Sequence, residues 1–159
     1  MTFLSRSFVS LLLWVGLCVG GGALVGITTS GGDSAWYQSI PKPEWTPPGW
    51  VFAPVWTTLY ALMGVAAWLV WRKGGWSAQA VPLRIFLVQL TLNFAWSFLF
   101  FTLHRVDWAL ADIALLWATL AVTIRTFAAV DVRAGWLLAP YLAWVSFAAG
   151  LNLAIYRLQ

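Results

Sequence analysis

Long apolar segments alternate with short polar or glycine- and proline-rich connections along this chain of 159 residues. Each apolar segment is longer than the roughly 20 residues that an α-helix needs to cross a membrane. The pattern predicts five membrane-spanning helices, at residues 3–29, 50–72, 78–103, 108–130 and 134–158. The predicted fold class is therefore an all-α integral membrane protein, in which residues 1–159 form one domain, a bundle of five transmembrane helices.

The longest connection, residues 30–48, leads into an aromatic segment that continues into the second predicted helix. This segment, Trp36–Tyr60, contains four Trp, two Tyr and five Pro residues. Because proline lacks an N–H and restricts φ, we expect a rigid, structured loop that is neither helix nor sheet. Such a loop suits a cover over a pocket for a flat hydrophobic ligand. The alternative is an aromatic belt at the membrane surface, which Trp45 fits, although a belt does not need five prolines.

Composition supports the membrane assignment, because 62% of the residues are hydrophobic and 9% are charged. Soluble domains carry about 25% charged residues. The net charge of +4 is spread along the chain without a basic run, which argues against nucleic acid as a partner. The one cysteine, Cys18, has no partner for a disulfide within the chain.

Basic residues predict an orientation for the bundle, because they concentrate on the cytoplasmic side of membrane proteins. The N-terminus and the second and fourth connections share one side, with six basic residues against three on the other. The six are Arg6, Arg72, Lys73, Arg84, Arg125 and Arg133, and the three are Lys42, Arg105 and Arg157. This bias predicts a cytoplasmic N-terminus and an external aromatic loop, provided that the protein inserts through an inner membrane.

Three predicted helices carry stripes that combine aromatic rings with an amide, a phenol or a thioether. The stripes are Trp56, Tyr60 and Met63; Gln89, Asn93, Trp96 and Phe100; and Tyr141, Trp144, Ala148 and Asn152. Polar side chains at membrane depth face the bundle interior or a cavity. The three amides could simply hydrogen-bond between helices. Three stripes together with an aromatic loop favour a ligand cavity with apolar walls and a few polar groups.

The remaining polar residues suggest structural roles. We expect Asp107 to cap the fourth helix, and Asp112 to bond a helix end or to pair with Arg84 or Arg105 rather than to act as a proton relay. His104 suits a turn at the membrane surface better than a haem axial ligand. With one histidine, one cysteine and no carboxylate pair, the sequence predicts neither a metal site nor a catalytic triad.

Four motifs give the chain a family resemblance. They are WYQSIPKPEWTPPGWVFAPVWTTLYALMG, QLTLNFAWSFLFF, DWALAD and PYLAWVSFAAGLN. In order and spacing they resemble the translocator protein or tryptophan-rich sensory protein family (TspO/MBR, also called peripheral benzodiazepine receptors). The resemblance implies a five-helix membrane bundle, usually a homodimer, that needs no cofactor. It also implies that the protein binds porphyrins such as protoporphyrin IX or haem-like tetrapyrroles, and in animal members cholesterol and synthetic drug ligands.

The resemblance also implies a pocket between the helices beneath the first long loop. By position, its walls are Trp36, Trp50, Trp56, Tyr60, Asn93, Trp96, Phe100, Trp144, Ala148 and Asn152. The family counterparts of Trp56 and Asn93 can bond a polar group of the ligand. Those of Trp36 and Trp144 are implicated in porphyrin breakdown by some bacterial members.

Two departures from the family pattern affect its partners. Tyr156 is followed at once by Arg157, which breaks the sterol motif after the last helix. The third predicted helix lacks the small residues of the family's dimer seam, for which glycines of the first helix are a substitute. Those glycines, Gly16, Gly20, Gly22 and Gly26, favour packing within the chain over a dimer seam.

The leading functional hypothesis is a membrane receptor or sensor that binds a tetrapyrrole. One alternative is an enzyme that degrades porphyrin with light through Trp36 and Trp144. Another is a transporter of porphyrin or sterol ligands, although the five unlike helices show no inverted repeat.

Overall fold

The computed structural model describes residues 3–29, 32 and 34–159, with side chains from Ser7 onward in that range. The structure is all helical in this range, with five long helices, the short helix α2 and two single turns. The elements are α1 (Phe3–Thr29), α2 (Ala35–Ser39), the 3₁₀ turn η2 (Gly49–Val51), α3 (Phe52–Trp71), α4 (Gly75–Ser97), the π-helical turn η3 (Phe98–Thr102), α5 (Val106–Val130) and α6 (Val132–Leu158).

Five segments of this structure are long and apolar enough to cross a membrane, which confirms the predicted fold class. They are Ser7–Thr29, Gly49–Trp71, Gly75–Thr102, Val106–Val130 and Val132–Leu158. The last three begin two or three residues before the predicted starts. In the third span, Gln79 has non-helical backbone angles (φ −120°, ψ 26°) three residues before Pro82. Proline disturbs the preceding helical turn, so the first turn of α4 is set off from the rest.

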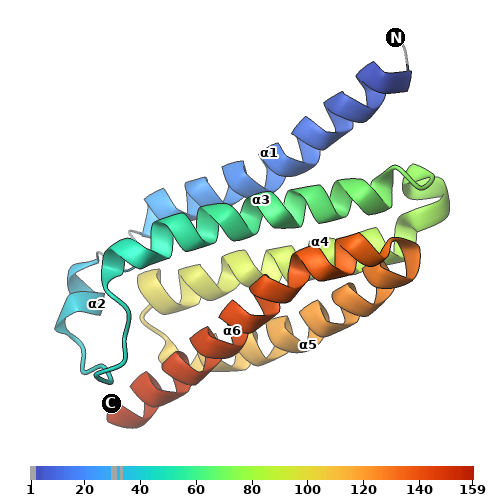
Figure 1. The fold of residues 1–159 in the computed structure, drawn as a ribbon. Coiled ribbons are helices and arrows are strands. Elements are labelled where there is room, and N and C mark those ends of the chain that lie inside the picture. The colour runs from blue at the N-terminus through green and yellow to red at the C-terminus, as the bar shows by residue number, and fades with distance from the viewer. Residues whose placement is uncertain (1–2, 30–31, 33) are drawn as a thin grey trace.

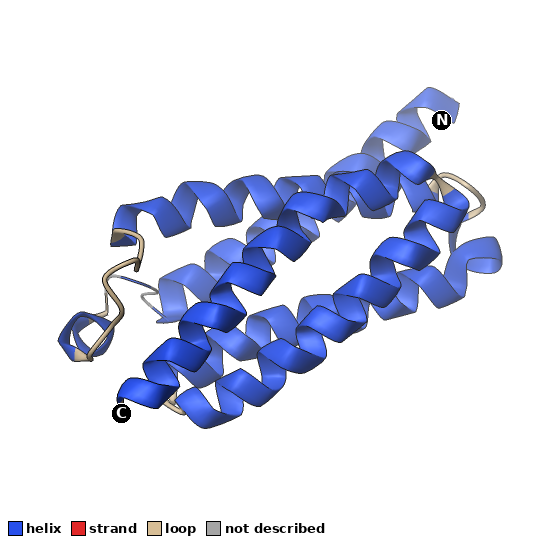
Figure 2. Ribbon diagram, turned by 60° about the horizontal axis from the view of Figure 1, so that its bottom comes forward, coloured by secondary structure: helices blue, strands red, loops and turns tan. Residues whose placement is uncertain are grey.

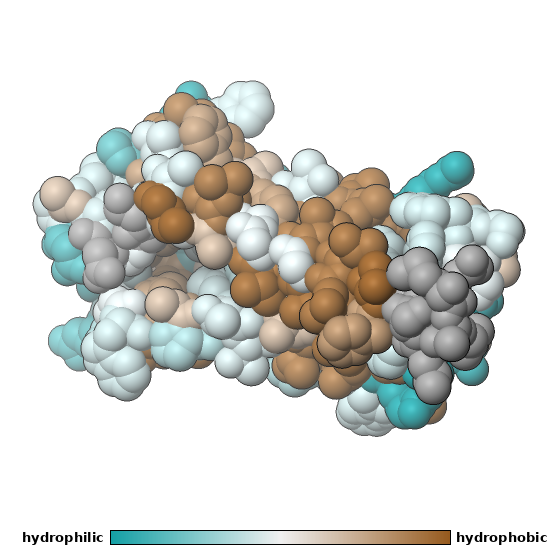
Figure 3. Space-filling view, turned by 90° about the horizontal axis from the view of Figure 1, so that it is seen from above, coloured by the Kyte–Doolittle hydropathy of each residue, from teal (hydrophilic) through white to brown (hydrophobic). Residues whose placement is uncertain are grey.

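The long helices run side by side, with the chain termini at opposite ends of the bundle (Figure 1). α1 lies along α3, and its N-terminal part extends away from the other helices, while α2 lies at the same end as the C-terminus. Loops are confined to the two ends (Figure 2). Hydrophobic residues gather in the middle of the α1 face, between more hydrophilic ends (Figure 3). This distribution is the one that a membrane-spanning bundle requires.

The long loop was predicted to contain no helix, and this prediction is wrong for Ala35–Ser39. Ser34 starts α2 by accepting a hydrogen bond from the N–H of Tyr37 at 3.2 Å. Lys42 stabilises its other end, because its Nζ donates to the carbonyl oxygens of Tyr37, at 2.5 Å, and Ile40, at 3.0 Å. A local cap and a cation on the last carbonyls allow five residues to form a helix between the prolines.

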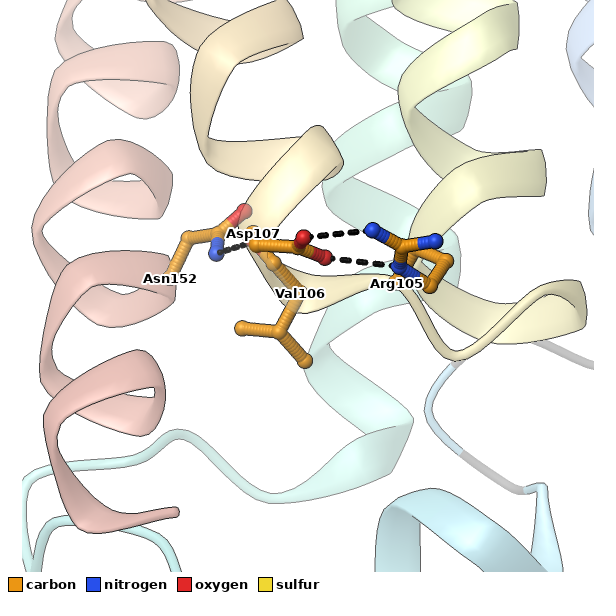
Figure 4. A network of polar contacts seen from close by, with 4 residues as sticks. All are labelled: Arg105, Val106, Asp107 and Asn152. Carbon is orange, nitrogen blue, oxygen red and sulfur yellow. Dashed lines mark hydrogen bonds and ion pairs between the residues drawn. The ribbon is translucent and has the colours of Figure 1, made fainter.

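The expected roles of the two acids near the start of α5 are also wrong. The helix begins at Val106, so Asp107 lies in its first turn instead of capping it. There Asp107 accepts two hydrogen bonds from Arg105, at 2.9 and 2.6 Å (Figure 4). Asp112 therefore does not pair with Arg105, and it does not pair with the exposed Arg84 either. Its side chain faces the core with 8% exposure, and its Oδ2 has no hydrogen-bond partner among the described residues.

The close approach of α1 to α3 depends on Gly64. A Cβ atom at this position would lie 2.5 Å from the Cα of Val15, so no larger residue fits without moving a helix. Nearby, the indole N–H of Trp68 donates to the carbonyl of Ser7 at 2.9 Å. The α1 glycines differ in their surroundings. Gly22 lies directly against the Tyr60 ring, whereas a Cβ atom added at Gly20 would meet no atom within 4 Å.

We expect Gly64→Ala to lower the free energy of unfolding by about 1–3 kcal/mol, the usual cost of overpacking. The matched control is Gly20→Ala on α1, where the added methyl group has open space. Alanine favours a helix over glycine by up to about 1 kcal/mol, so the control keeps or gains stability. Reversible unfolding in detergent, followed by circular dichroism, measures both. Equal effects of the two substitutions would contradict the close packing of α1 on α3.

Candidate functional site

Polar side chains in the bundle core pair with one another across helices. The phenol of Tyr60 on α3 donates to Oδ1 of Asn93 on α4 at 2.5 Å. The indole N–H of Trp96 donates to Oδ1 of Asn152 on α6 at 3.0 Å. The amide of Asn152 in turn donates to the carbonyl of Val106, at the start of α5, at 3.1 Å (Figure 4). These bonds tie α3 to α4, α4 to α6, and α6 to α5.

Gln89 forms a further bridge in the core. Its Oε1 accepts from the phenol of Tyr141 at 3.0 Å, and its amide donates to the sulfur of Met63 at 4.0 Å. All three amides of the predicted stripes thus hydrogen-bond between helices, as one of the two sequence interpretations proposed. Members of the same stripes also border two cavities, so hydrogen bonding between the helices does not exclude a ligand cavity.

The larger cavity has a volume of about 370 Å³ and lies between α1, α3 and the end of α4 with η3. Of the predicted wall residues, Trp56 and Tyr60 line it. The α1 wall includes Val19, Gly22 and Gly26, and the sequence interpretation missed this wall. The only signal for it was the run of glycines, which predicts close helix packing as readily as a cavity.

The smaller cavity, of about 20 Å³, lies between α2, α6 and the end of α4 with η3. Five predicted wall residues line it, namely Trp96, Phe100, Trp144, Ala148 and Asn152. Phe52 and Phe101 line both cavities, so these two rings form the partition between them. The stripes expected to surround one pocket therefore border two adjacent ones.

Three predicted wall residues lie outside both linings. Trp50 is 74% exposed, on the 3₁₀ turn before α3. Asn93 is buried behind Tyr60, to which it is bonded. Trp36 on α2 stacks on His104 with 4.2 Å between ring centroids and 14° between ring planes, and it meets the edge of Phe100 at 5.5 Å. His104 thus lies in a turn, as expected, and contacts the loop.

Residues 34–48, which we call the cover, lie against the bundle through aromatic contacts. Tyr37 is 3% exposed, lines the smaller cavity, and packs edge-on against Phe101 at 5.5 Å. Burial raises the pKa of the Tyr37 phenol, which therefore stays neutral at physiological pH. Trp45 is 53% exposed but contacts Phe147 of α6 at 5.6 Å. The sequence interpretation missed Tyr37, although it directly follows Trp36 in the aromatic segment.

Some buried polar atoms around the cavities have no partner among the described residues. They are the phenol oxygen of Tyr37, the indole N–H of Trp144 and the amide nitrogen of Asn93. A buried donor without a partner costs about 1–3 kcal/mol, so an acceptor oxygen on a ligand would be favourable here. The described residues include no group of three or more metal-binding side chains. The arrangement suits the binding of an apolar, aromatic molecule that carries hydrogen-bond acceptors.

Comparison with known proteins agrees with this architecture. The sequence model of the TspO/MBR family matches residues 14–157. The tryptophan-rich protein TspO of Chlorobaculum tepidum is 40% identical over 159 residues, which cover 98% of this chain and 99% of that protein. The translocator protein of Sus scrofa is 42% identical over 139 residues, 86% of this chain and 82% of that protein. The tryptophan-rich sensory protein of Cereibacter sphaeroides is 42% identical over 124 residues, 78% and 77% of the two chains. This chain is therefore a multi-pass membrane protein that belongs to the TspO/MBR family.

Proposed function

We propose that this protein is a membrane receptor or sensor that binds a tetrapyrrole, such as protoporphyrin IX, between its helices. The observation that carries the proposal is the cavity of about 370 Å³ with Trp56 and Tyr60 in its wall. Small-molecule sites occupy roughly 300–1,000 Å³ and are mostly apolar and aromatic, with few polar groups. Trp56 and Tyr60 stack on each other at 5.5 Å, which presents flat surfaces to a flat ligand.

The second cavity extends the space that a large macrocycle could use. The residues common to the linings of both cavities are Phe52 and Phe101. Phe52 is half-buried, and rotation of its side chain would join them into one slot that reaches Trp144. The unpartnered indole N–H of Trp144 would then have an acceptor in a carboxylate or carbonyl oxygen of the ligand.

We expect purified protein to show saturable quenching of tryptophan fluorescence on titration with protoporphyrin IX. Trp56→Ala removes a wall of the larger cavity and Trp144→Ala removes one of the smaller. Each should weaken binding by about tenfold, since about 1.4 kcal/mol corresponds to a factor of ten and a buried aromatic contact contributes at least that much.

Trp136→Ala is the matched control, because Trp136 lies on α6 with 74% exposure and lines neither cavity. It should leave the dissociation constant unchanged. Loss of affinity in all three variants, or in none, would show that the quenching does not report on the aromatic cavities.

The orientation of the bundle is a second part of the proposal. The termini lie at opposite ends (Figure 1), and the end with the N-terminus holds the basic connections around Arg72 and Arg133. By the charge bias, the N-terminus is cytoplasmic and the cover is external. Arg6 contributes to this bias, but its side chain lies outside the described residues.

We expect alkaline phosphatase fused after Gln159 to be active and green fluorescent protein fused there to be dark, because the C-terminus would lie on the external side of an inner membrane. Paired fusions of alkaline phosphatase, which needs an oxidising compartment, and green fluorescent protein measure the side directly. A fluorescent, phosphatase-inactive C-terminus would reverse the proposed orientation. Homodimerisation stays a prediction of the family resemblance, and porphyrin breakdown and transport stay alternative hypotheses. Sterol binding is not expected through the broken motif at Tyr156 and Arg157.

A further inference from the structure

The larger cavity is open on one side. Its exposed lining residues all come from α1 and α3, and they are Ala23, Gly26, Ile27, Ala53 and Thr57. The wall on the far side, formed by Tyr60 and Phe101, is buried. The opening therefore lies between α1 and α3, where these two helices are side by side (Figure 1). We call the five exposed residues the portal.

The portal lies within the membrane. Its residues belong to the spans Ser7–Thr29 and Gly49–Trp71. At 1.5 Å per residue, Ala53 and Thr57 lie about 6 and 12 Å below the start of the second span. The hydrocarbon layer is about 30 Å thick, so the portal faces the lipid of one leaflet. The α1 face is hollowed toward the end that carries α2 (Figure 3).

The side chains of the portal suit the passage of an apolar molecule. Gly26 and Ala53 are small, and a Cβ atom at Gly26 would meet no atom within 4 Å. The hydroxyl of Thr57 donates to the carbonyl of Ala53 at 2.8 Å. It therefore presents no free donor to lipid, where an unsatisfied polar group is costly.

The cover, by contrast, is held down over the smaller cavity. Trp36 of α2 stacks on His104, Tyr37 of α2 is buried, and Lys42 donates hydrogen bonds to carbonyls at the end of α2. Entry from water through this part would require breaking several contacts at once. At the portal, the exposed lining residues include the small Gly26 and Ala53, and no such set of contacts has to break.

We infer that the ligand enters the larger cavity sideways from the bilayer, between α1 and α3. The portal fits a flat, lipid-soluble aromatic molecule that partitions into the membrane before it reaches the protein. This inference rests on the proposed function for the identity of the ligand, but the portal itself can be tested without any ligand.

The kinetic test uses Gly26→Leu in phosphatidylcholine vesicles that already contain protoporphyrin IX, with tryptophan quenching followed after vesicle mixing or flash dilution. The leucine side chain would stand in the portal. We expect association to slow by about tenfold, or about 1.4 kcal/mol on its barrier. The dissociation rate is measured alongside it, because Gly26 also lines the cavity and a leucine there changes the binding wall as well as the portal.

Two controls accompany this variant. Gly20→Leu makes the same change on α1 at another open position, outside the cavity lining, and should leave both rates unchanged. His104→Ala removes the stacking partner of Trp36 and loosens the cover. If the ligand enters through the portal, His104→Ala should leave the association rate unchanged. If the ligand entered through the cover, the same variant should bind faster. An unchanged association rate in Gly26→Leu, or faster association in His104→Ala, would overturn the inference.

The ligand-free test places a nitroxide label on Ala53→Cys in the vesicles. The native Cys18 is fully buried and does not compete for the label. Collisions with oxygen, which dissolves in lipid, should exceed those with a water-soluble nickel chelate. The control Glu44→Cys, on the exposed cover, should show the reverse.

The two tests separate the possible failures. If position 53 is more accessible to the nickel chelate than to oxygen, the portal does not face lipid and the inference is wrong, whatever the ligand is. If position 53 is accessible to oxygen but wild-type protein shows no saturable quenching, the portal stands and the proposed tetrapyrrole function fails.

Discussion

The structure depends above all on the need of every polar group inside a membrane to find a partner within the protein. Lipid offers no hydrogen bonds, so an amide or a phenol at this depth has to face another helix. Asn93 bonds to Tyr60, Gln89 to Tyr141, and Asn152 to both Trp96 and the first turn of α5. These bonds orient α3, α4, α5 and α6 relative to one another. The aromatic rings on the same stripes are thereby carried to the borders of the cavities.

α1 has a different relation to the bundle, and this difference creates the larger cavity. Its contact with α3 is closest near Val15 and Gly64, where glycine allows backbone to meet backbone. Many large side chains along α1 are exposed, and among the described residues the bond from Trp68 to the Ser7 carbonyl is the side-chain hydrogen bond that joins α1 to α3. Further toward the cover, Gly22 accommodates the Tyr60 ring instead of a helix backbone. The space left between α1 and α3 there is bordered by small residues, and it opens toward lipid.

The sequence alone predicts the five helices well, because the need to span a membrane leaves a strong signal in hydropathy. It also predicts the inward stripes, since aromatic and amide residues recur at helical spacing. The sequence predicts less well those features that depend on a contact with one particular side chain. Asp107 looked like a helix cap, but Arg105 binds it in the first turn. α2 escaped prediction because prolines suggest an irregular loop, whereas the Ser34 cap and the Lys42 contacts act only after the loop folds. The division into two cavities depends on how the Phe52 and Phe101 rings pack against each cavity, and helical spacing alone does not predict a partition.

That partition also links the site to the cover. Phe52 lines both cavities and packs edge-on against Tyr37 of α2 at 6.3 Å and against Trp144 of α6 at 6.0 Å. A ligand confined to the larger cavity can leave Phe52 in place. A ligand that spans both has to displace it, and Tyr37 then loses a packing partner. Tyr37 is buried and its phenol lacks a partner among the described residues, so displacement of Phe52 would change the contacts that hold the cover. A sensor needs such a dependence, since a bound molecule can be reported only through contacts that differ between the empty and the occupied states.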